Sequence, residues 1–291
     1  MSKLSGARAR AAAVTERGQG WVESRDPASK QGVAVAWWKA FRDVEGPRQS
    51  ILLTTYVFLA VFPALLVLAE YMENNPAALA NHLVARYGLS HETTVLLRGV
   101  LVDTETHKLG TALLAMASAL FFGLGFGYVL QRVHMRAWRI DLRIRTSDQA
   151  RYAAVLLVLF GMILVLLVQA TELVDAPGWD EDVLAIGWFL VLVAYFVWAP
   201  YLLMHGRLPA RAFVGAAVLT SVCIVGLVLV SSFLLATWVD FYAKDYGGFG
   251  VVMALFFWIG VASTIIVVAA SLSPALGARR DLLRERAQPP D

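Results

Sequence analysis

The stretch YAAVLLVLFGMILVLLVQAT, residues 152–171, decides the fold class. It contains no charged side chain. An α-helix rises about 1.5 Å per residue, so a helix of this length matches the roughly 30 Å thickness of a bilayer's hydrocarbon core. Its apolar residues run continuously rather than alternating with polar ones, and this favours a transmembrane helix over the strand of a barrel.

Further apolar runs of similar length occupy residues 51–69, 109–130, 183–204, 212–236 and 248–273. Across the 291 residues, 58% are apolar and 16% are charged, a balance outside the usual composition of soluble domains. Because lipid offers the backbone no hydrogen-bond partners, each run should be a helix. The sequence therefore predicts an all-α, polytopic membrane protein in which residues 47–276 form a domain of six transmembrane helices.

The basic residues set the predicted orientation. All 25 Lys and Arg residues except Arg86, Arg98, Lys108 and Lys244 fall on one side of the bilayer when the six spans are threaded in turn. Positively charged connections stay in the cytoplasm, so both termini are predicted to be cytoplasmic. Arginines near the headgroups attract anionic lipid at about 1 kcal/mol each. We expect the bilayer and anionic lipid at its cytoplasmic face as partners, rather than nucleic acid.

An interfacial amphipathic helix is predicted over residues 31–46, before the first span. Val33, Trp37, Phe41 and Val44 recur there at helical spacing, beside cationic side chains. This pattern is typical of a helix that lies in the plane of the headgroups. The remaining segments are predicted to be a disordered basic tail (1–30), an external helical loop (70–108) and a basic cytoplasmic tail (277–291).

The sequence offers few groups for chemistry. No charged residue or histidine falls near the middle of a predicted span, which disfavours a buried proton relay. The lone cysteine, Cys223, excludes an internal disulfide and is interpreted as a packing residue. We predict no catalytic residue, metal site or cofactor, and no enzymatic activity. The histidines lie in loops or at membrane edges and are interpreted as surface residues: His82, His91, His107, His134 and His205.

Some residues can break a helix or let helices approach closely, and these are the candidates for a cavity. A proline inside a span removes a backbone donor and bends the helix. Pro63 lies inside the first predicted span, and Pro200 lies near the end of the fourth. Glycines four residues apart form a face for close helix packing, and glycines around a turn let the backbone approach another group. A Gly-Leu-Gly-Phe-Gly stretch in the second span follows no strand, so a nucleotide loop is disfavoured. The candidate binding residues are Pro63, Gly123, Gly127, Tyr246, Gly247 and Gly250.

Several motifs make the chain resemble the YihY/BrkB family of bacterial inner-membrane proteins, once labelled ribonuclease BN. The motifs are Tyr56 with Val61-Phe62-Pro63, Arg136-Ala137-Trp138, Pro209 and Arg211 with Gly215-Ala216, and Tyr246-Gly247-Gly248-Phe249-Gly250 with Trp258. The resemblance implies six helices and a location in the inner (plasma) membrane. This chain departs from the family pattern at Met135, where an Asn is usual, and at Ser271, where a Glu is usual.

Three functions remain open on this evidence. The leading hypothesis is a permease-like protein that moves a lipid or small molecule through a cavity between the helices. The alternative is a structural or scaffolding membrane protein with stable partners. The membrane-attached ribonuclease of the older family label is the weakest, because the sequence shows no acidic cluster for metal ions.

Overall fold

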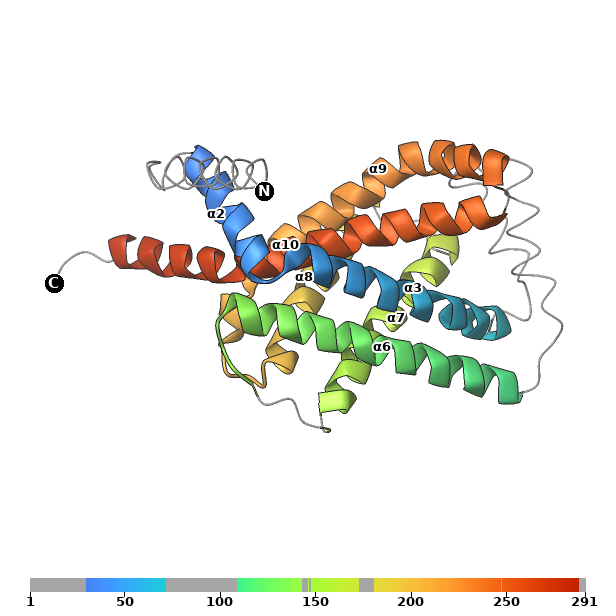
Figure 1. Cartoon of the computed structure of the whole chain (residues 1–291), viewed down its shortest axis with the longest axis horizontal. Coiled ribbons are helices and arrows are strands. Elements are labelled where there is room, and N and C mark those ends of the chain that lie inside the picture. Colours follow the sequence, from blue (N-terminus) through green and yellow to red (C-terminus); the bar gives the residue numbers. More distant parts are fainter. Residues whose placement is uncertain are drawn as a thin grey trace, which may run out of the picture.

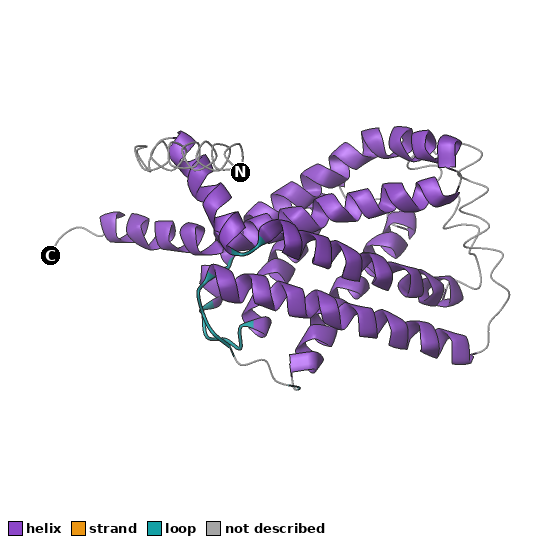
Figure 2. Ribbon diagram, viewed as in Figure 1, coloured by secondary structure: helices purple, strands orange, loops and turns teal. Residues whose placement is uncertain are grey.

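The computed structural model describes residues 30–71, 109–142, 146, 148–172, 181–246 and 248–287. These residues are helical apart from short connections, and no strand occurs among them (Figure 2). The prediction of an all-α fold is confirmed for this part of the chain. Residues 1–29 of the predicted disordered tail and nearly all of the predicted external loop lie outside the described residues, while Lys30 begins a helix.

Figure 1 shows the arrangement of the described helices. In chain order they are α2 (Lys30–Asp43), α3 (Gly46–Tyr71), α6 (Leu109–Ala137), α7 (Asp148–Glu172), α8 (Glu181–Leu203), the 3₁₀ turn η1 (Ala210–Ala212), α9 (Val214–Tyr246) and α10 (Gly248–Ala287). Helix α2 coincides with the predicted amphipathic segment, while its position in the headgroup plane stays a prediction.

Each of the six predicted spans coincides with one helix from α3 to α10. Three of them, α8, α9 and α10, contain segments long and apolar enough to cross a membrane: Ala185–Leu203, Val214–Ser231 and Val252–Leu276. Helices α3, α6 and α7 comprise 26, 29 and 25 residues, each more than the roughly 20 that a span requires. The number of membrane crossings remains a prediction.

Two helices extend well beyond the apolar runs that predicted them. Helix α9 continues to Tyr246 rather than ending near residue 236, and α10 continues to Ala287 rather than ending near residue 273. The extension of α10 is rich in Ala, Leu and Arg, which are strong helix formers. Apolar runs mark the part of a helix that suits lipid, whereas helix ends depend on local propensity and capping.

Residues with positive φ end helices α2, α6 and α8. These residues are Glu45, Arg139 and His205, with φ of 55°, 51° and 58°. After α6, Ile140 N–H donates to the Met135 carbonyl and Arg139 N–H to the Arg136 carbonyl, the paired bonds of a Schellman cap. Helix α8 ends in the same way around His205. A non-glycine residue in this conformation is uncommon, so other contacts must hold each turn.

The helices pack as a closed ring in the order α3, α6, α7, α8, α9 and α10, with α10 returning to α3. Helix α6 also contacts α8 and α10, so it lies toward the middle of the bundle. The largest cluster of buried apolar residues draws on α3, α6, α7, α8 and α10, with Val44 at the α2–α3 turn. A smaller cluster, Leu142, Met204 and Phe213, seals the connections at one end.

Glycines in α6 bring its two neighbours close on opposite sides. A Cβ added at Gly127 would lie 2.6 Å from the Cα of Tyr152 in α7, and one added at Gly123 would overlap Leu156 of α7. Gly125 faces the other way, against the ring of Tyr56 in α3. The predicted close approach at Gly123 and Gly127 is therefore confirmed, with α7 as the neighbour.

The outer faces of α8, α9 and α10 are apolar and exposed. Only 22% of the residues in each of their three candidate spans are buried within the protein. The exposed large side chains include Ile186 and Leu190 on α8, Val228 and Leu229 on α9, and Phe257 on α10. Soluble monomers rarely expose contiguous apolar surface on this scale. The surroundings that suit these faces are the acyl chains of a bilayer.

Candidate functional site

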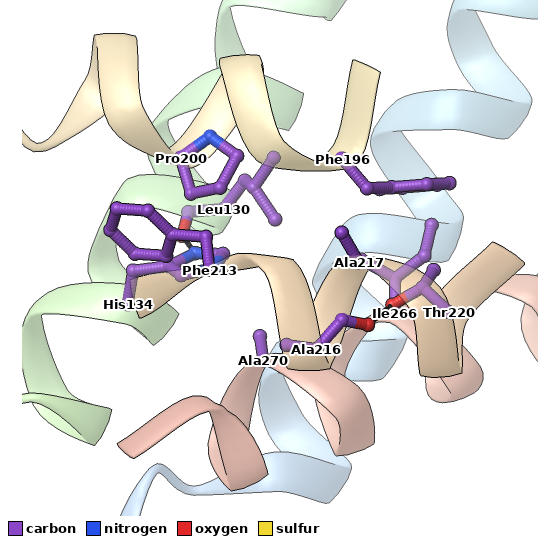
Figure 3. Close-up of a pocket in the computed structure, with 10 residues that line it drawn as sticks. All are labelled: Leu130, His134, Phe196, Pro200, Phe213, Ala216, Ala217, Thr220, Ile266 and Ala270. Carbon is purple, nitrogen blue, oxygen red and sulfur yellow. Dashed lines mark hydrogen bonds between the residues drawn. The ribbon is translucent and has the colours of Figure 1, made fainter. Parts of the chain in front are cut away.

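A small cavity lies where α6, α8, α9 and α10 meet (Figure 3). Its volume is about 20 Å³, room for roughly one water molecule. The lining residues come from all four helices and the turn before α9: Leu130, His134, Phe196, Pro200, Phe213, Ala216, Ala217, Thr220, Ile266 and Ala270. The wall is therefore mainly apolar, with one imidazole and one hydroxyl.

His134 is the most polar group in the cavity wall. Its side chain is 5% exposed, so the prediction that it is a surface residue is wrong. Its Nδ1 lies 2.9 Å from the Leu130 carbonyl (Figure 3). A carbonyl can only accept, so Nδ1 carries the proton, and Nε2 of the neutral ring is left as an acceptor. The rings of His134 and Phe213 form a T-shaped pair with centroids 5.8 Å apart, and this contact helps to fix the orientation of the imidazole.

Thr220 contributes the cavity's hydroxyl, but its proton is already used. Its Oγ1 donates to the Ala216 carbonyl at 2.9 Å, one helical turn earlier in α9. The oxygen can still accept a hydrogen bond. Ala216 and Ala217 on the same helix leave the space that a larger side chain would fill.

Two prolines interrupt the backbone hydrogen bonding beside this cavity. Pro200 is inside α8 and Pro274 is inside α10. A proline has no N–H to donate to the carbonyl four residues earlier, here those of Phe196 and Ala270. Both of these residues line the cavity. Pro200 stood out in the sequence as a helix-bending residue, whereas Pro274 follows the last apolar run and its position inside a helix could not be seen.

A buried hydrogen-bonded network fixes the end of α8 beside the cavity. Gln131 of α6 donates from Nε2 to the Leu203 carbonyl at 2.7 Å. The Tyr152 hydroxyl of α7 donates to Gln131 Oε1. Tyr195 of α8 donates to the Val155 carbonyl at 3.2 Å. All three side chains are buried, so each bond replaces one that water would otherwise supply, and together they join α6, α7 and α8.

A second contact joins the turn after α8 to the start of α7. His205 Nε2 lies 2.8 Å from Asp148 Oδ1, and Arg151 Nη1 lies 3.7 Å from the same oxygen. The Asp148 side chain is 1% exposed. A buried carboxylate requires partners, so this pair ties the positive-φ turn at His205 to α7.

At the α2–α3 turn, Glu45 pairs with arginines from two helices. Its Oε2 lies 2.9 Å from Arg136 Nη1 of α6 and 3.4 Å from Arg48 Nη1 of α3. The Arg136 guanidinium also reaches the Val44 carbonyl at 3.5 Å. The hydrogen bond from Arg136, with the positive charges of Arg136, Arg48 and Arg132, lowers the pKa of Glu45 below its ordinary value of 4.5.

Among the candidate residues taken from the sequence, those whose side chains the structure describes do not line the cavity. Gly123 and Gly127 are buried against α7. Tyr246 is exposed at the end of α9, and Gly250 is buried in the first turn of α10. Pro63 is within α3, but its side chain lies outside the described part of the structure. Gly247 lies outside the described residues altogether. None of the described candidates lines the cavity, and their role in binding stays a prediction.

The cavity residues gave only weak signals in the sequence. Ala216, Ala217, Leu130 and Ile266 are ordinary residues of apolar runs, and nothing in their spacing marks them. Across the described ranges, no three His, Cys, Asp or Glu side chains are grouped so that they could hold a metal ion. The arrangement can therefore offer a small molecule apolar contact and a few hydrogen bonds.

Long apolar helices in a closed ring, with apolar side chains turned outward, define an all-helical integral membrane protein. The sequence model of the virulence factor BrkB family matches residues 37–291, and the chain belongs to that family. The resemblance seen in the sequence motifs is thus confirmed. No curated protein and no solved structure matches the chain.

Proposed function

We propose that this protein is a permease-like component of the inner membrane that moves a lipid or a small amphiphilic molecule and catalyses no reaction. It crosses the bilayer six times and keeps both termini in the cytoplasm. The cavity between α6, α8, α9 and α10 carries the proposal, because it lies where two helices are interrupted by proline. Helices interrupted in this way leave backbone carbonyls available to a passing molecule.

The arrangement of the helix ends supports the proposed topology. Helix α2, the start of α3, the end of α6 and the extension of α10 lie at one end of the bundle (Figure 1). These segments belong to the arginine-rich side of the sequence. A reporter fused at residue 141 should remain in the cytoplasm, whereas its export would refute the orientation.

The exposed first half of α8 supports movement of this helix. Val183, Ile186, Leu190 and Val191 in its first half are all exposed, while its last turn is held by the Gln131 network. Pro200 separates the two parts. A helix interrupted by proline can tilt about the interruption and widen the cavity beside it, and such a tilt of α8 would break the hydrogen bond from the Tyr195 hydroxyl to the Val155 carbonyl.

Lipid movement between leaflets tests the proposal directly. Purified protein is reconstituted into vesicles with fluorescent phosphatidylglycerol or phosphatidylethanolamine, and dithionite bleaches the outer leaflet. The wild type should expose the inner-leaflet probe faster than empty vesicles do. A soluble fluorophore encapsulated in the same vesicles reports whether a small anion, here dithionite itself, enters them. Equal bleaching in protein-containing and empty vesicles for every probe would refute the proposal.

A pair of variants on one helix connects the activity to the cavity. Ala217→Leu fills the cavity, whereas Val218→Leu adds bulk at the next residue, which is exposed. Lipid movement should fall in Ala217→Leu and persist in Val218→Leu. If both variants behave alike at equal protein content, the cavity is not on the path.

The scaffolding alternative has one observation in its favour. Helix α10 comprises 40 residues and projects beyond the bundle at the end where α2 lies (Figure 1). A projecting helix of this kind can bind another protein. Crosslinking in intact cells from residues 277–287 should then recover a reproducible partner, and its absence would count against the scaffolding function.

A further inference from the structure

Two arginine side chains contact the Glu45 carboxylate where α2, α3 and α6 meet, and a third arginine lies one helical turn from one of them. Arg48 belongs to α3, while Arg132 and Arg136 lie one turn apart on α6. All three act electrostatically on Glu45, and Arg136 and Arg48 contact it at 2.9 and 3.4 Å. One carboxylate cannot neutralise three guanidinium groups, so this arginine cluster retains a surplus of positive charge.

The arginine cluster is accessible and partly pre-oriented. The Arg48 side chain is 71% exposed, and that of Arg136 is 27% exposed. Arg132 is held by a hydrogen bond from its Nη1 to the Tyr128 hydroxyl at 3.1 Å. Guanidinium groups match phosphate oxygens in geometry and charge, and pre-orientation reduces the entropy lost on binding.

Helix α2 shows which kind of phosphate the arginine cluster would meet. Trp37 and Trp38 are 44% and 60% exposed, and Lys39 and Arg42 beside them are also exposed. Asp43 is the one acidic residue of α2. Exposed tryptophans beside cations are typical of a helix that rests at the headgroup level of a bilayer.

We propose that the arginine cluster binds the phosphate of an anionic phospholipid in the leaflet on which α2 rests, and that Glu45 is the internal counterion with which this phosphate competes. This lipid site adds a binding partner to the proposed function. It rests on the proposed topology, in which α2 faces the inner leaflet. Binding of lipid to Arg48 and Arg132 leaves the Glu45–Arg136 pair in place. Stronger binding draws Arg136 away from Glu45 and loosens the α2–α3 turn.

Native mass spectrometry of the full chain in detergent tests the site without requiring transport. The probes are phosphatidylglycerol, phosphatidylethanolamine and soluble glycerol phosphate. We expect phosphatidylglycerol to bind more tightly than either of the others, with affinity that falls as salt rises. Equal affinity for the two lipids would overturn the proposal, and so would equally tight binding of glycerol phosphate, because the site would then recognise a soluble anion.

Variants assign the binding to these residues. Arg48→Gln should weaken phosphatidylglycerol binding about five-fold, and Arg48→Gln with Arg132→Gln about 25-fold. Arg207→Gln, an exposed arginine in the turn after α8, makes the same charge change elsewhere and should leave the affinity unchanged. If the single variant Arg48→Gln matches this control, the arginine cluster does not bind lipid.

Glu45→Gln separates a competing counterion from a structural residue. Removal of the carboxylate frees Arg136, so phosphatidylglycerol should bind several-fold more tightly than it does to the wild type. A purely structural role predicts unchanged or weaker binding, and either result would overturn the competition. Because flux is measured separately in vesicles, a failure of the lipid site and a failure of the permease function give different results.

Discussion

Replacing Gly127 by alanine tests how closely α6 and α7 pack. The new methyl group would lie 2.5 Å from the Cβ and 2.6 Å from the Cα of Tyr152. Carbon atoms prefer separations of about 3.5–4.0 Å, so the two helices must move apart by roughly 1 Å. Because the obstructing Cα belongs to the backbone, no rotation of a side chain can relieve the contact.

Two opposing terms set the magnitude. Overpacking of a well-packed core costs about 1–3 kcal/mol, while replacing a helical glycine by alanine returns up to about 1 kcal/mol. A shift of α7 also disturbs the bond from the Tyr152 hydroxyl to Gln131, and a buried polar atom left unpaired costs about 1–3 kcal/mol. We expect a net loss near 2 kcal/mol, which corresponds to a decrease in Tm of roughly 4–8 °C.

The assay is thermal unfolding in detergent, with Gly161→Ala in α7 as the control. A Cβ added at Gly161 meets nothing within 4 Å, so this variant should unfold at the wild-type temperature or slightly above. If Gly127→Ala and Gly161→Ala share the wild-type Tm, the close approach of α6 and α7 does not exist as described.

Three further changes have defined outcomes. Gln131→Leu removes the donor to the end of α8 and leaves a buried carbonyl unpaired, so we expect a loss of about 1–3 kcal/mol in the free energy of unfolding and faster proteolysis of the turn after α8. His205→Asn keeps a residue that tolerates positive φ but shortens the reach to the buried Asp148 carboxylate, so the Tm should fall and the variant should remain folded. The pairing of Glu45 with Arg136 lowers the pKa of the Glu45 carboxyl below 4.5. The stabilisation that this pair contributes is therefore present above pH 4.5 and is lost as the pH falls through the lowered pKa. The difference in Tm between the wild type and Glu45→Gln should therefore be largest near pH 7 and shrink below pH 4.5; a difference that grows with acid would contradict this sign.

Helix positions followed from the sequence because a long apolar run has one stable backbone form in lipid. Close packing at Gly123 and Gly127 was also predictable, since small residues four apart share a helix face. The ends of α9 and α10 were not, because the polar residues that continue them are good helix formers without a hydropathy signal. Sequence spacing could not assign Gly125 to α3, because that contact depends on which helix packs on the opposite face.

The candidate site was harder to predict than the fold. His134 follows an apolar run and resembles a residue at the membrane edge, yet Phe213 from a distant turn covers it. The cavity is formed by residues from four helices, and their common neighbourhood depends on the closed ring rather than on any local motif. The sequence predicted basic residues at the cytoplasmic face, but it could not show that Arg48 and Arg136 both contact Glu45. That contact depends on the positive-φ turn between α2 and α3.

The length of α10 has a mechanical consequence. Forty residues at about 1.5 Å each make a rod of roughly 60 Å, twice the thickness of the hydrocarbon core. About 20 Å of this rod lies beyond Pro274, most of it past the apolar segment that ends at Leu276, and a bend of about 10° at the proline would swing its tip by roughly 3–4 Å. Small displacements among the packed helices thus become larger movements of the tip of α10, which projects beyond the bundle at the end where α2 lies (Figure 1).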